Sequence, residues 1–146
     1  MTSPINGAVE AAVRSVMADR AVGTDAPAVA AALAGLYDVL ARHLEPLMGT
    51  LAVRAIYGRS LHLTTEEVPW IAAAGAVVQA GAGQADALRA CLEQQDPSAA
   101  TEGARVLLVA FVDLLARLIG EGLTTRLMAQ AWPRAFPEGA GQKAMR

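Results

Sequence analysis

The most apolar part of the chain reads 106-VLLVAFVDLLARLI-119, fourteen residues that carry only two charges, Asp113 and Arg117. A membrane-spanning helix needs about 20 mostly apolar residues, so the stretch is interpreted as a core helix. Upstream of this stretch lies Asp96, and aspartate commonly caps helix N-termini. The cap and the apolar stretch together predict one helix over residues 98–120. At 100° per residue, the apolar side chains cover most of its circumference.

A helix that is apolar over so much of its circumference must be covered on nearly all sides. We therefore expect this helix at the centre of the domain or at the interface of a homodimer. Asp113 and Arg117 are spaced to form an i,i+4 ion pair on its one polar stripe, or a register-fixing contact within a dimer interface. The candidate interface residues are Leu107, Phe111, Asp113, Leu114, Arg117 and Leu118.

The composition places the whole chain in the all-α class. Alanine and leucine account for 33 and 17 of the 146 residues, whereas aromatic residues make up only 4%. These residue types favour helices and disfavour a β-sandwich or barrel. We expect one helical domain over residues 1–137, a bundle of about five to seven helices, and a flexible tail over residues 138–146. No internal repeat is evident.

The apolar spacing and the capping signals predict helices over residues 7–22, 24–46, 47–63, from 69 onward, 84–95, 98–120 and 123–132.

Charge and cysteine content exclude several kinds of partner. The formal net charge is −2 and the basic residues are scattered singly, so nucleic acid is not an expected partner. The chain shows neither a signal-peptide pattern nor a span long enough for a bilayer, which predicts a cytoplasmic protein without a membrane partner. Cys91 is the only cysteine and is expected to be a buried side chain on a helix.

Four residues form the candidate ligand site: Tyr57, Arg59, His62 and Trp70. An arginine, an imidazole and two aromatic rings suit a small anionic or aromatic ligand. The alternative for His62 is structural, because a histidine in the last turn of a helix interacts favourably with the free carbonyl groups. A less favoured hypothesis is a helical enzyme in which His62 acts as acid or base with Glu66 or Glu67.

No cofactor is expected from the sequence. His43 and His62 would suit a metal or haem if they lay together, but their spacing does not require this. No nucleophile or phosphate-binding loop accompanies them. The sequence therefore favours a non-enzymatic binding or regulatory module that forms a homodimer and recognises a protein partner or a small ligand. The alternative is a small-molecule or cofactor-binding protein.

Overall fold

Two long helices of equal length form the middle of a bundle built entirely from helices. The computed structural model describes residues 4–18, 24–75 and 83–133, and within these ranges it contains no strand. The all-α prediction is confirmed. The expected tail over residues 138–146 lies outside the described residues. The elements are α1 (Pro4–Ala18), α2 (Ala26–Met48), α3 (Thr50–Thr65), the 3₁₀ helix η1 (Pro69–Ala72), α5 (Gln84–Glu93), α6 (Pro97–Ile119) and α7 (Glu121–Ala131).

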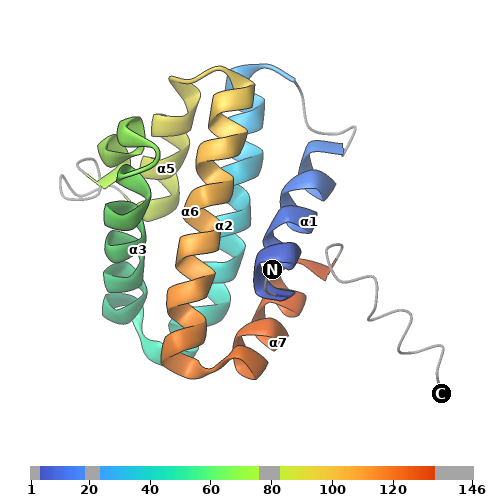
Figure 1. Ribbon diagram of the computed structural model, residues 1–146, viewed down its shortest axis with the longest axis vertical. Helices are drawn as coiled ribbons and strands as arrows, with labels where there is room; N and C mark the ends of the chain where they lie inside the picture. The colour runs from blue at the N-terminus through green and yellow to red at the C-terminus, as the bar shows by residue number, and fades with distance from the viewer. Residues whose placement is uncertain (1–3, 19–23, 76–82, 134–146) are drawn as a thin grey trace.

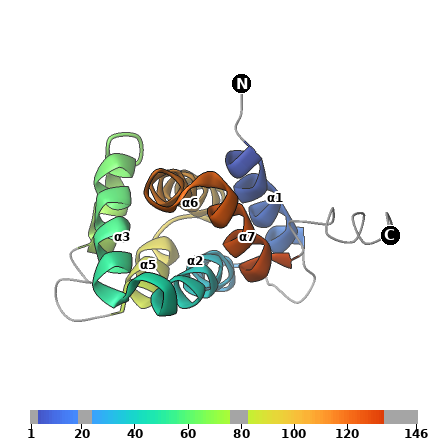
Figure 2. The ribbon, with the colours of Figure 1, turned by 90° about the horizontal axis from the view of Figure 1, so that it is seen from below.

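The arrangement places α2 and α6 side by side, with α3 and α5 on one flank and α1 and α7 on the other (Figures 1 and 2). α6 contacts α1, α2, α3, α5 and α7, so it touches every other α-helix that the structure describes. None of the described helices has the length and apolar character needed to cross a bilayer.

The second half of the chain repeats the helical layout of the first half. Both α2 and α6 are 23 residues long, and their N-caps, Asp25 and Asp96, each accept a hydrogen bond from a backbone amide three residues later. Both end at a glycine with positive φ, +90° at Gly49 and +94° at Gly120, a backbone conformation that glycine adopts at little cost. Each of these two glycines also serves as N-cap of the helix that follows.

The two halves share the pattern of buried positions but not the residue types at those positions. When Gly49 is matched with Gly120, all four buried positions of α7 correspond to buried positions of α3. The contacts repeat as well, because each short α-helix packs on the long helix of the other half. The residue types differ (Val53 corresponds to Thr124), which explains why the sequence shows no evident repeat.

The end of α2 differs from the prediction. Proline lacks a backbone N–H and clashes with the preceding turn, so the sequence predicts that the helix over residues 24–46 stops or kinks at Pro46. Instead α2 continues through the exposed Pro46 to Met48, and the chain turns at Gly49, whose N–H donates to Glu45 O at 2.9 Å. The glycine, not the proline, therefore terminates the helix.

The surroundings of α6 correct part of the interface prediction. Leu107 and Phe111 are buried within the bundle and cannot meet a partner. Leu114 is half-buried, and Asp113, Arg117 and Leu118 are exposed. The expected ion pair is present, with Arg117 Nη2 3.4 Å from Asp113 Oδ2. The helix is thus covered on one side and open on the other. The expectation that it is enclosed nearly all round is not confirmed.

Candidate functional site

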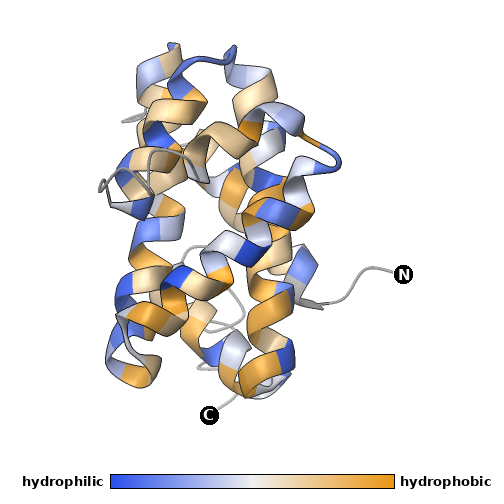
Figure 3. Cartoon of the chain, turned by 90° about the vertical axis from the view of Figure 1, so that its left-hand side faces the viewer, coloured by the Kyte–Doolittle hydropathy of each residue, from blue (hydrophilic) through white to orange (hydrophobic). Residues whose placement is uncertain are grey.

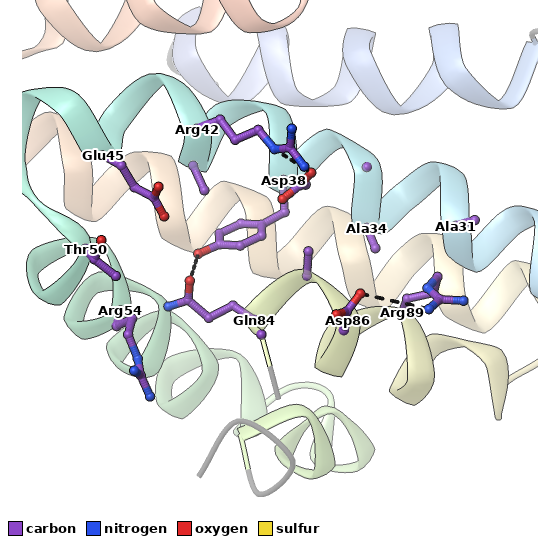
Figure 4. A pocket seen from close by; sticks show the side chains of 15 residues that line it. Ala31, Ala34, Asp38, Arg42, Glu45, Thr50, Arg54, Gln84, Asp86 and Arg89 are labelled. Carbon is purple, nitrogen blue, oxygen red and sulfur yellow. Dashed lines mark hydrogen bonds and ion pairs between the residues drawn. The ribbon is translucent and has the colours of Figure 1, made fainter. Parts of the chain in front are cut away.

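A polar groove of about 550 Å³ lies between α2, α3 and the N-terminal end of α5 (Figure 4). We call it the α2/α5 groove. Small residues leave space along α2 and α5, and charged side chains stand around this space. It is lined by Ala31, Ala34, Gly35, Tyr37, Asp38, Ala41, Arg42, Glu45, Thr50, Arg54, Gly83, Gln84, Ala85, Asp86 and Arg89.

Two tyrosines and a glutamine connect the groove to the core. The Tyr37 hydroxyl donates to Gln84 Oε1 at 3.2 Å, and the Tyr57 hydroxyl donates to the Gln84 backbone oxygen at 3.5 Å. The centroids of the two tyrosine rings are 5.0 Å apart, and the rings of Tyr37 and Phe111 are nearly perpendicular with their centroids 5.2 Å apart. Gln84, the first residue of α5, is therefore held in place by residues of α2 and α3.

Burial raises the pKa of both tyrosine hydroxyls above the ordinary value. For Tyr37, the charges of Tyr57, Glu45 and Asp38 add to the effect of burial. For Tyr57, burial is the main cause of the raised pKa, and a negative charge on Cys91 would raise it further. Both hydroxyls therefore stay protonated at neutral pH and act as hydrogen-bond donors, which suits binding and not proton transfer.

The side-chain amide of Gln84 has an unused donor. Its Oε1 accepts from Tyr37, but its Nε2 is buried and has no hydrogen-bond partner among the described residues. A buried donor left unsatisfied costs about 1–3 kcal/mol. Figure 4 shows Nε2 directed toward the side of the groove that holds Thr50 and Arg54. Because Nε2 itself has almost no exposed surface, a bound acceptor group would satisfy this amide once the side chain turns slightly into the groove.

The charged walls contain paired and unpaired groups. Arg42 Nε lies 3.0 Å from Asp38 Oδ2, and Arg89 lies 3.9 Å from Asp86 and 3.3 Å from Glu93. The exposed Arg54 and Glu45 form no ion pair with any described residue. One cation and one anion of the groove thus remain available to a ligand.

On α6, the positions that match Tyr37, Asp38 and Glu45 of α2 carry apolar residues. With Gly49 matched to Gly120, Tyr37 corresponds to Leu108, Asp38 to Val109, and Glu45 to Ala116. Leu108 is as fully buried as Tyr37, so an apolar side chain suffices at this position of the long helix. The Tyr37 hydroxyl is therefore not required for packing at this position.

The structure does not bring the four predicted ligand-site residues into one pocket. Tyr57 is 1% exposed and faces Tyr37 in the core. Arg59 is exposed and lines a shallow depression beside α6. His62 is exposed in the last turn of α3. Trp70 is half-buried in η1, where its ring covers Gly103 of α6.

The histidines and the cysteine occupy ordinary positions. His43 lies inside α2, where Nδ1 is 2.9 Å from Val39 O, and His62 lies on another helix. No group of three or more His, Cys, Asp or Glu side chains among the described residues is placed to hold a metal ion. Cys91 is buried as predicted, its Sγ donates to Trp70 O at 3.5 Å, and burial raises the pKa of its thiol.

Sequence reasoning did not identify the groove. Its central hydrogen bond joins Tyr37 and Gln84, which are 47 residues apart on different helices. The available signal was a tyrosine in an otherwise aliphatic stripe of α2, at a position where the second half has Leu108. Comparisons with protein-family models, curated proteins and solved structures gave no match.

Proposed function

We propose that the protein is a non-enzymatic helical module that binds a small polar molecule in the α2/α5 groove. The observation that carries this proposal is the buried, unpartnered Nε2 of Gln84 beside the groove. The held amide, the protonated Tyr37 hydroxyl and the two unpaired charges support recognition without chemistry. A cytoplasmic location and the absence of a nucleic-acid partner remain part of the proposal.

A thermal-shift screen tests the groove. The panel contains the twenty amino acids, small mono- and dicarboxylates, nucleosides and monosaccharides. A binder present at 100 times its Kd should stabilise the folded state by about 2.7 kcal/mol, which is a measurable rise in Tm. We expect Gln84→Leu and Arg54→Gln to lose most of this rise.

Arg126→Gln is the matched control, because Arg126 is an exposed arginine of α7 with no ion pair among the described residues. It should keep the full rise in Tm. The proposal fails if no compound stabilises the wild-type protein. It also fails if the compounds stabilise Gln84→Leu as strongly as they stabilise the wild type.

A second proposal, self-association, is favoured by exposed leucines beside α6. Leu118 and Leu51 are 64% and 81% exposed, and Leu118 lines a shallow apolar depression between α3 and α6. Figure 3, seen from the α3 side, shows hydrophobic turns gathered at the lower end of the bundle. Exposed apolar patches commonly mark protein interfaces. We call this surface the α3/α6 patch. It consists of Leu51, Ala55, Ile56, Arg59, Leu114, Arg117 and Leu118.

Sedimentation equilibrium distinguishes a dimer formed through the α3/α6 patch from a monomer. We expect wild-type protein to dimerise and Leu118→Glu to be monomeric, because the substitution places a charge where apolar surface would be buried. Leu47→Glu is the control, since Leu47 is 52% exposed at the corresponding position of α2 and lies outside the patch. A wild-type protein that is monomeric at every concentration, or a Leu118→Glu variant that still dimerises, would contradict this proposal.

A further inference from the structure

The charges of the α2/α5 groove narrow the class of its ligand. Three arginines (Arg42, Arg54, Arg89) and three carboxylates (Asp38, Glu45, Asp86) line the groove, so their formal charges cancel. The ion pairs of Arg42 and Arg89 neutralise most of this set. What remains is one unpaired cation and one unpaired anion, facing the same space.

One end of the groove suits a carboxylate. Arg54 supplies a guanidinium group, which binds carboxylates through two parallel hydrogen bonds. The Nε2 donor of Gln84 needs an acceptor and points to the same end, as Figure 4 shows. The exposed Thr50 also lines the groove, between Glu45 and Arg54 in Figure 4. A neutral acceptor would satisfy Gln84 but leave Arg54 without a counter-charge.

The opposite side suits an ammonium group. In Figure 4, Glu45 extends from α2 toward the Tyr37 end of the Tyr37–Gln84 hydrogen bond, whereas Arg54 of α3 lies toward its Gln84 end. An ionised carboxylate only accepts hydrogen bonds, and an ammonium group only donates them. Burial is the main cause of the raised pKa of the Tyr37 hydroxyl, and the nearby negative charge of Glu45 adds to it.

We propose that the ligand is a zwitterion with one carboxylate and one ammonium group, as in a free α-amino acid. This inference rests on the proposed function of the groove. The Arg54 guanidinium and Gln84 Nε2 bind the carboxylate, and Glu45 binds the ammonium group. A purely anionic ligand would leave Glu45 facing a like charge, and a purely cationic ligand would do the same to Arg54. The small residues of the groove (Ala31, Ala34, Gly35, Ala41 and Ala85) leave room for the ligand's side chain.

Calorimetric titration with three forms of each amino acid tests the inference. The forms are the free amino acid, its N-acetyl derivative and its carboxamide. Loss of either charge should weaken binding by about tenfold or more, since a charge-assisted hydrogen bond contributes about 1.5–3 kcal/mol. The variants should remove these preferences separately. Arg54→Gln should no longer distinguish acid from carboxamide, and Glu45→Gln should no longer distinguish the free from the acetylated amine. Arg126→Gln should keep both preferences.

The outcomes separate this inference from the proposed function. If N-acetyl or carboxamide forms bind as tightly as free amino acids, the ligand is not recognised as a zwitterion and the inference is overturned. If no amino acid binds but a nucleoside, sugar or simple carboxylate binds in a Gln84-dependent way, the inference is overturned while the proposed function stands. If no compound binds, both fail.

Discussion

Phe111→Ala is expected to lower the free energy of unfolding by about 3–5 kcal/mol, the usual cost of emptying a buried phenylalanine site. Phe111 is fully buried, and its ring meets Tyr37 edge-on at an interplanar angle of 89°. The substitution removes this aromatic contact and leaves a cavity behind the Tyr37 ring. Urea denaturation followed by circular dichroism at 222 nm measures the effect.

Two further variants make the Phe111 result interpretable. Phe111→Leu fills more of the site and should cost less than Phe111→Ala, so it provides a folded comparison if the alanine variant does not fold. Leu47→Ala removes an exposed side chain at the end of α2, outside the α3/α6 patch, and should change stability by no more than about 0.5 kcal/mol. If Phe111→Ala and Leu47→Ala had similar effects, Phe111 could not be the core contact that the structure shows.

Phe111 also illustrates what periodicity can and cannot predict. The apolar stripe of α2 was predictable, and Val29, Leu33, Leu36, Leu40 and Leu44 are all buried. The aspartate N-caps of α2 and α6 were equally predictable, because a cap acts within one turn of its own helix. Whether an apolar residue such as Phe111 or Leu118 faces its own bundle or a partner depends on which helices lie beside it. That information is spread over the whole chain.

The candidate site was unpredictable for the same reason. The sequence drew attention to His62, Arg59 and Trp70 because they are close along the chain, yet the helix directs their side chains to different surroundings. The groove instead depends on Tyr37 and Gln84, which meet only when α5 packs against α2. Scarce residue types indicate chemistry, but tertiary packing decides which of them meet.

Because the helical layout occurs twice, the two copies can be compared to tell residues needed for packing from residues that serve another role. α2 and α6 occupy equivalent places, so a residue type that differs between them at a buried position is not dictated by the layout. Leu108 meets the packing requirement that Tyr37 meets on α2. The tyrosine hydroxyl is therefore additional to packing, and among the residues that the structure describes it donates to Gln84 of the groove.

The same comparison identifies Gly103 of α6 as a packing requirement. A Cβ atom at Gly103 would lie 2.6 Å from two ring carbons of Trp70, so glycine is needed for the indole to lie on the helix. The corresponding residue of α2, Ala32, lines an open apolar hollow of about 330 Å³. On α6 the Trp70 ring occupies the space above the helix, whereas the matching space on α2 is a hollow among the residues that the structure describes.

Gly103→Ala is therefore expected to destabilise the protein, although alanine is the better helix former. The helix propensity favours alanine by about 1 kcal/mol, and overpacking costs about 1–3 kcal/mol, so the net change should be a loss. Gly58→Ala is the matched control: Gly58 lies within α3, and a Cβ there meets nothing within 4 Å. The same chemical change should stabilise the protein at Gly58 and destabilise it at Gly103.

Urea denaturation measures the sign of the change in the free energy of unfolding for each variant. Tryptophan emission should shift to longer wavelength only for Gly103→Ala, because only that variant displaces Trp70 toward water. Stabilisation at both positions would show that η1 moves aside freely and that Trp70 is not a fixed part of the core.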